Sequence, residues 1–203
     1  MGDKKIIICL GRQFGSGGRE VANVLGQKLG IPVYDNELIT RAAEESGISQ
    51  ELFAKNDERR GMFSASNFIT FGRFSAGDSY IGDNGIFRIQ SEVIRNIVEK
   101  GSAIFIGRCS DYILRDMDKL DVFITAPIEA RIKRVAKRDG ISEDQARSLI
   151  AKKDRTRETY YNYYTFGNWG VADNYDLCID SEFLGVSGTA DIIIEVAKKK
   201  GLI

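Results

Sequence analysis

The chain has 203 residues, 43% of them hydrophobic and 29% charged, and its 29 Lys and Arg balance its 29 Asp and Glu. A domain of this length buries a substantial core, and zero net charge gives no electrostatic footprint for a nucleic-acid polymer. The absence of histidine excludes imidazole bases and His-containing zinc sites. Phosphoryl transfer is compatible with that absence, because it depends mainly on positioning and electrostatics.

The N-terminal segment and the spacing of the cysteines favour a cytoplasmic location. The apolar run at residues 6–10 is too short for a membrane span or a signal peptide. Cys9, Cys109 and Cys178 are far apart and form no CxxC pair, and the first and last lie in apolar runs, as small buried residues do. We therefore expect a cytoplasmic protein with no membrane partner.

The first elements are predicted to be a strand, a glycine-rich loop and a helix. Residues 6–10 form a continuous apolar run with β-branched residues, which is typical of a buried parallel strand. Residues 11–19, with the sequence GRQFGSGGR, follow it, and apolar residues then recur at helical spacing from Val21 to Leu29. This order is that of a nucleotide-binding α/β unit.

The remaining elements continue the alternation. Apolar runs predict further strands at residues 31–35, 103–106, 122–125 and 177–179. Periodicity and capping predict helices at residues 36–45, 86–100, 128–138, 142–161 and 188–199, and another short helix begins near Ser49. We expect a single α/β domain, a three-layer parallel sheet of about five strands flanked by helices, with ligands at the carboxyl ends of the strands.

The glycine-rich loop has the composition of a phosphate-binding loop. Gly15, Ser16, Gly17 and Gly18 stand after a strand and before a helix, where backbone N–H groups and the helix dipole can hold an anion. The strict P-loop pattern G-x-x-x-x-G-K-[ST] is not met in either register. Glu20 stands where a serine or threonine for magnesium would follow Arg19.

Two registers of the loop remain open. If Gly17 is the last glycine, Gly18 takes the lysine position and Arg12 the first-glycine position. If Gly18 is the last, Arg19 takes the lysine position and Gln13 the first. We favour Arg19, together with Arg12, as the phosphate cation, because a guanidinium can bind a phosphate through two hydrogen bonds.

Four segments give the chain a resemblance to the cytidylate kinase-like family, which extends from residue 6 to about residue 196. They are residues 11–20 (GRQFGSGGRE), 34–41 (YDNELITR), 106–109 (IGRC) and 154–157 (DRTR). The resemblance implies a P-loop fold with a helical lid at residues 131–169 and an acceptor-side insert at residues 57–85. It also implies transfer of the γ-phosphoryl group of ATP to a nucleoside monophosphate, CMP or dCMP, with Mg²⁺ held largely by water.

The resemblance also assigns roles to charged residues. Those that would neutralise charge on the transferred group are Arg19, Arg131, Arg134 and Arg157. Those that would bind the acceptor are Asp35, Arg41, Arg88, Arg108, Asp154 and Arg157. The spacing of Arg131 and Arg134 puts them on one helix face. The alternative to a role at the transferred group is therefore that they belong to a solvated charged face.

Several alternatives stay open at this point. One alternative is a kinase for a different small acceptor, because Cys109 stands where the family has an aspartate. The missing loop lysine makes a nucleotide- or phosphate-binding protein without catalysis another. Residues 57–85 are either a disordered surface insert or, as we favour, a mobile cover for the acceptor. The aromatic residues 160–169 either stack on a base or, as we favour, pack the lid or a dimer face.

Overall fold

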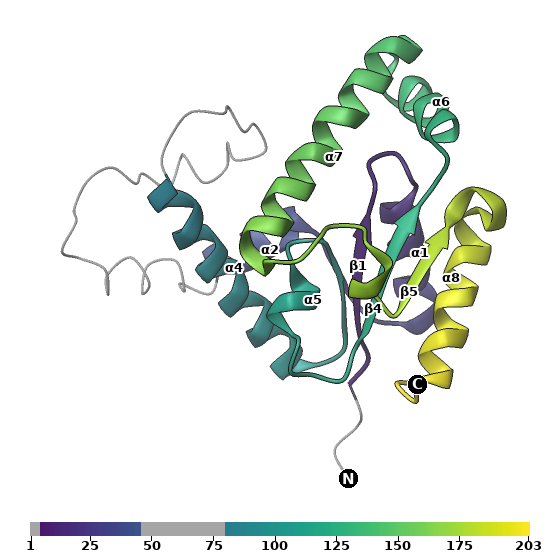
Figure 1. Ribbon diagram of the computed structural model, residues 1–203. Helices are drawn as coiled ribbons and strands as arrows, with labels where there is room; N and C mark the ends of the chain where they lie inside the picture. The colour runs from purple at the N-terminus through teal and green to yellow at the C-terminus, as the bar shows by residue number, and fades with distance from the viewer. Residues whose placement is uncertain (1–4, 46–79) are drawn as a thin grey trace.

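A five-stranded parallel sheet forms the centre of the structure, a computed structural model that describes residues 5–45 and 80–203 (Figure 1). Its strand order is β2-β3-β1-β4-β5, and every pairing between neighbours is parallel. The strands are β1 (Ile7–Arg12), β2 (Val33–Tyr34), β3 (Ala103–Ile106), β4 (Leu120–Thr125) and β5 (Leu177–Asp180). The predicted parallel sheet of about five strands is therefore confirmed.

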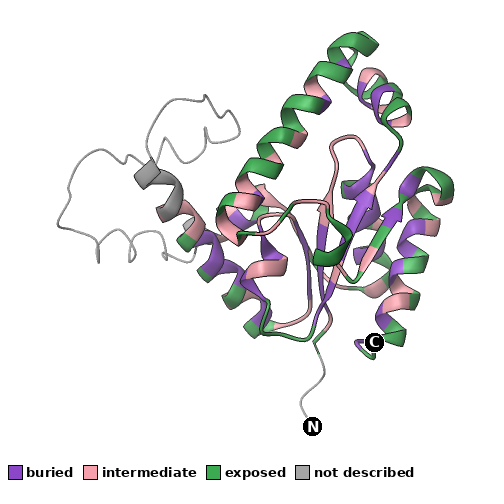
Figure 2. Cartoon of the chain, viewed as in Figure 1, coloured by how far each residue is buried: buried purple, intermediate pink, exposed green. Residues whose placement is uncertain are grey.

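Helices cover both faces of this sheet and make it the middle of three layers (Figure 2). Along β1, Ile8 and Leu10 pack toward α1 (Gly18–Leu29) and α8 (Ser181–Lys199). Ile7 and Cys9 pack toward α2 (Asn36–Glu45), α4 (Tyr80–Lys100) and α5 (Ser110–Ile113). Since successive side chains of a strand point to opposite faces, one apolar run supplies both halves of the core.

A helical hairpin stands beyond the carboxyl ends of the strands (Figure 1). It consists of α6 (Ile128–Asp139) and α7 (Glu143–Thr165), and a short 3-10 turn, η3 (Ala172–Asn174), follows. The hairpin has its own small core, in which Ile132, Val135 and Ile150 are buried and Phe14 of the glycine loop packs against them. The helix predicted from residue 142 is confirmed, and Ser142 caps it in a full capping box with Gln145.

Some boundaries differ from those predicted. The helix expected from residue 86 begins at Tyr80, so residues 80–85 of the expected insert are helical, despite their two glycines. The rest of that insert, residues 57–79, and the helix expected near Ser49 lie outside the described residues. α8 begins at Ser181 rather than at residue 188, and non-helical Gly185 interrupts it. α5 spans four residues, too few to produce a periodic signal.

Aromatic residues of the segment 160–169 pack within the described structure. Tyr164 of α7 stacks on Phe87 of α4, with ring centroids 4.1 Å apart and an interplanar angle of 7°. Trp169 meets Phe123 of β4 edge to face, with centroids 5.2 Å apart. α7 is thereby attached to α4, and the segment that follows α7 is attached to the sheet. No helix in the described ranges combines the length and apolar character that crossing a membrane requires.

Gly26 allows α1 to approach β2 closely. A β-carbon there would lie 2.5 Å from Val33 Cγ2 and 3.0 Å from the Ile31 carbonyl oxygen. We expect Gly26→Ala to lower the free energy of unfolding by about 1–3 kcal/mol through overpacking, although alanine is the better helix former. Urea denaturation measures the change.

The matched control is Gly101→Ala, because a β-carbon at Gly101 would meet no atom within 4 Å. Its free energy of unfolding should stay within about 0.5 kcal/mol of wild type. Equal stability of the two variants would contradict the close approach.

Candidate active site

Glycines with positive φ shape the loop between β1 and α1. Gly15 has a φ of 80° and Gly17, the N-cap of α1, a φ of 78°, values that residues with a β-carbon rarely adopt. In the described ranges, the amides of Gly15, Gly17 and Gly18 donate to no backbone acceptor. These amides stand at the positive end of the α1 dipole and are therefore free to bind an anion.

The interior of the loop is fixed by serine hydroxyls. Ser16 is fully buried, and its Oγ donates to the Gln13 carbonyl at 2.9 Å. Ser181, at the start of α8, donates from its Oγ to the Ser16 carbonyl and to the Thr125 carbonyl. The Ser16 hydroxyl therefore holds the loop from inside, and its side chain is turned away from any ligand. Sequence reasoning missed Ser181, because the contact joins residues with no motif between them.

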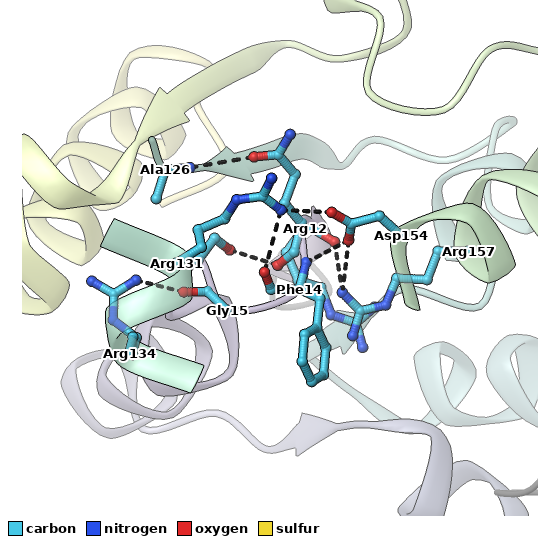
Figure 3. A network of polar contacts seen from close by, with 10 residues as sticks. Arg12, Phe14, Gly15, Ala126, Arg131, Arg134, Asp154 and Arg157 are labelled. Carbon is cyan, nitrogen blue, oxygen red and sulfur yellow. Dashed lines mark hydrogen bonds and ion pairs between the residues drawn. The ribbon is translucent and has the colours of Figure 1, made fainter. Parts of the chain in front are cut away.

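Asp154 of α7 joins the glycine loop to both helices of the hairpin (Figure 3). Its Oδ1 accepts from the Phe14 amide at 2.6 Å, and its Oδ2 accepts from Arg131 Nη1 at 2.5 Å. The Arg131 side chain is 9% exposed and that of Asp154 is 18% exposed. The resemblance assigns Asp154 to the acceptor, whereas both of its oxygens are occupied within the chain in this structure.

Three arginines of the hairpin donate to consecutive parts of the loop. Arg131 donates to the Phe14 carbonyl at 3.3 Å, and Arg134 donates to the Gly15 carbonyl at 2.6 Å. Arg157 donates to the carbonyl of Arg12 at 3.1 Å. A trans peptide group points its N–H opposite to its C=O. The contact on the Phe14 carbonyl therefore turns the amide of Gly15 away from α6 and toward the open side of the loop.

Four guanidinium groups gather where β1 and β3 end, namely those of Arg12, Arg19, Arg108 and Arg157. Burial, and after it repulsion by the other three, lowers the pKa of Arg12 to about 9. Burial likewise lowers the pKa of Arg157, although Asp154 opposes this. Mutual repulsion of like charges favours the binding of an anion near them. The structure thus brings together arginines from three of the four segments on which the resemblance rests.

Arg108 is held in this cluster by an unusual backbone. Gly107, Arg108 and Cys109 have φ values of 72°, 59° and 55°, a left-handed run in which only the first residue is glycine. Such residues cluster at functional sites, because strain persists only where the surroundings impose it. The Arg108 guanidinium carbon lies 5.2 Å from the centre of the Tyr160 ring. Cys109 is 2% exposed, and burial raises the pKa of its thiol.

A cavity of about 190 Å³ adjoins the loop at the carboxyl ends of β2 and β3. Its lining residues are Arg19, Asn23, Val33, Asp35, Leu38 and Ile106. Asp35 forms an ion pair with Arg19 and accepts at Oδ1 from the Glu37 and Leu38 amides, which caps α2. Helical spacing from Arg19 could have indicated Asn23, whereas Leu38 carried no signal in the sequence.

The other predicted acceptor residues lie elsewhere. Arg41 is exposed on α2 and bonds Glu45 at 2.7 Å, which raises the pKa of Arg41. Arg88 is exposed on α4. Neither is among the lining residues of the cavity. In the described ranges, no group of three acidic, Cys or His side chains could hold a metal ion. The carboxylate of Asp35 at the cavity suits Mg²⁺, which commonly keeps most of its water ligands.

The sequence is similar to those of two proteins named cytidylate kinase. The chain is 27% identical over 190 residues to a cytidylate kinase of Sulfolobus acidocaldarius, covering 93% of this chain and 92% of the relative. It is 28% identical over 194 residues to a cytidylate kinase of Methanobrevibacter smithii, covering 95% and 99%.

Solved structures show the same architecture. An uncharacterized protein from Eubacterium ventriosum superposes with a TM-score of 0.70 at 29% identity, covering 96% of this chain and 99% of the other. A shikimate kinase from Bacteroides thetaiotaomicron gives a TM-score of 0.52 at 14% identity, covering 95% and 98%, a likeness of fold alone. The sequence model of the cytidylate kinase-like family matches residues 7–182, from β1 into α8. The chain belongs to the cytidylate kinase-like family.

Proposed function

We propose that this protein transfers the γ-phosphoryl group of ATP to a nucleoside monophosphate, with CMP and dCMP as its acceptors. Family membership supports phosphoryl transfer between nucleotides. The observation that carries the proposal is the meeting of two anion sites at one edge of the sheet. Free amides of the glycine loop form one, and the cluster of Arg12, Arg19, Arg108 and Arg157 forms the other. A reaction between two phosphate groups needs such a pair.

On the donor side, the loop amides and the α1 dipole bind the polyphosphate. Arg131 and Arg134 act as positioning residues, because they already donate to the loop carbonyls of Phe14 and Gly15. Arg157, the member of the arginine cluster that donates to the Arg12 carbonyl, neutralises charge on the transferred group. Bound Mg²⁺ supplies further charge neutralisation on the phosphate oxygens, and Asp35 is the carboxylate that would hold its water ligands.

On the acceptor side, the cavity beside Arg19 and Asp35 receives the monophosphate, and Arg108 directs its phosphate toward the loop. α6 and α7 serve as the lid of a single kinase domain and close over the phosphates. Closure would exclude water from the reaction and prevent wasteful hydrolysis of ATP. Among the described residues, Arg41 and Arg88 lie outside the cavity lining, so neither is placed in the proposed site.

A coupled assay with ATP, Mg²⁺ and a panel of CMP, dCMP, UMP, AMP and GMP tests the proposal directly. We expect turnover with CMP and dCMP at roughly 1–100 per second, as in other phosphoryl-transfer enzymes. The other monophosphates should react at least about tenfold more slowly. Turnover with a different acceptor alone would replace the cytosine assignment and leave kinase activity standing.

Calorimetric titration with ATP completes the same test. ATP binding without turnover on any acceptor would favour a nucleotide-binding protein with a degenerate loop, an alternative that the missing lysine and Ser/Thr motivate. If the protein does not bind ATP at all, both the kinase and the binding protein are excluded.

The Asp154 contacts predict a second result. Asp154→Ala leaves Arg131 buried without its carboxylate and frees the Phe14 amide. Because an unpaired buried charge is strongly unfavourable, we expect the free energy of unfolding to fall by about 3 kcal/mol. ATP should also bind more weakly, since the loop loses one of its contacts with the lid, the one at the Phe14 amide.

Glu129→Ala is the matched control, because Glu129 pairs with Arg147 on the same two helices but in the open. Its stability should change by less than about 0.5 kcal/mol, and its affinity for ATP should not change. Chemical denaturation and calorimetry measure both variants. Indistinguishable behaviour would show that Asp154 does not hold the loop.

A further inference from the structure

The glycine loop lacks the lysine that a standard P-loop carries at the start of its helix. In the structure, Gly17 is the N-cap and α1 begins at Gly18. This fixes the register that the sequence left open. Gly18 stands at the lysine position, and Arg12, at the end of β1, stands at the first-glycine position. Compared with the standard pattern, the loop therefore has a glycine in place of the lysine and an arginine in place of the first glycine.

We propose that these two positions have exchanged roles, so that Arg12 supplies from the end of β1 the phosphate-binding cation that lysine supplies elsewhere from the start of α1. This inference rests on the proposed function. It differs from the expectation drawn from the sequence, which favoured Arg19 as the main cation.

The two positions touch in space, which makes the exchange possible. A β-carbon at Gly18 would lie 2.8 Å from Arg12 Cβ and 3.0 Å from Arg12 Cγ. The stem of Arg12 therefore fills the volume that the stem of a lysine at position 18 would occupy. Long side chains at both positions would collide, so only one of positions 12 and 18 can carry the cation.

A second glycine lets the guanidinium reach the site. A β-carbon on Gly107, at the end of β3, would overlap Arg12 Nη1. The guanidinium group thus lies over the backbone of Gly107, the residue that follows Ile106 of the cavity lining. Gly18 makes room for the stem and Gly107 for the charged end, and both glycines are explained by the path of one side chain.

Charge also favours Arg12 over Arg19. The Arg19 side chain is 63% exposed and is ion-paired with Asp35. Arg12 forms no ion pair with any described residue, and three arginines act on its charge more strongly than the one nearby carboxylate, Asp35, does. A partly buried cation without a carboxylate partner gains more from a bound polyphosphate than an exposed and already paired one.

The test is a double-mutant cycle of Arg12→Gly, Gly18→Lys and the combination of both, which restores the order of glycine and lysine in the standard pattern. Calorimetric titration with ATP in the absence of acceptor is the first readout, and kcat is the second. We expect Arg12→Gly to weaken ATP binding at least about tenfold and to lower kcat about 10²–10³-fold. Gly18→Lys should lose as much ATP affinity and kcat as Arg12→Gly does, because the lysine side chain would collide with that of Arg12.

The double variant should bind ATP at least about tenfold more tightly than either single variant, a coupling that independent sites do not show. Arg115→Gln serves as a control for loss of an arginine, because Arg115 is exposed and stacks on Tyr112. Far-UV circular dichroism and thermal unfolding identify variants that fail to fold.

Two outcomes would overturn the proposal. One is Arg12→Gly that folds and binds ATP within about threefold of wild type. The other is a folded double variant that binds no better than the weaker single variant. Wild-type protein without turnover but with this coupling in ATP binding would instead refute the kinase reaction and leave the exchange intact.

Discussion

The arrangement of this site depends on one carboxylate. Asp154 accepts from the Phe14 amide and from Arg131, and so connects the loop at the end of β1 to both helices of the hairpin. A partly buried ion pair of this kind contributes little net stability but is strongly unfavourable to break. It acts as a geometric constraint. With Asp154 in place, the carbonyls of Phe14 and Gly15 accept from arginines of α6, and the amide of Gly15 points away from that helix.

The same arrangement holds like charges near one another within the site. Arg12, Arg108 and Arg157 repel one another in surroundings that screen them poorly, and Arg108 adopts a left-handed backbone as well. The three-layer core supplies the stability that keeps this arrangement in place. An anion relieves the repulsion, so binding energy is available at the position where a phosphate would be transferred. Stability of the core and affinity of the site are therefore linked.

The sequence predicted the sheet more completely than the site. Apolar runs and glycines located all five strands, because those signals are local in the chain. The Phe14–Asp154 contact joins residues 140 positions apart and has no local signal. Counting along the loop also favoured Arg19, whose exposure and pairing with Asp35 depend on a neighbouring strand. The tight contact between Arg12 and Gly18 is likewise a property of packing, which spacing alone does not contain.

Trp169 has a practical consequence for following this molecule in solution. It is the only tryptophan of the chain, and it lies edge-on against Phe123 of β4 just after α7 ends. Its fluorescence therefore arises from one known place, the junction between the hairpin and the sheet. The emission wavelength and the quenching of Trp169 fluorescence therefore measure the solvent exposure of that junction without an attached dye. Trp169 fluorescence therefore reports on whether the end of α7, the longest helix in the described ranges, is docked on the sheet.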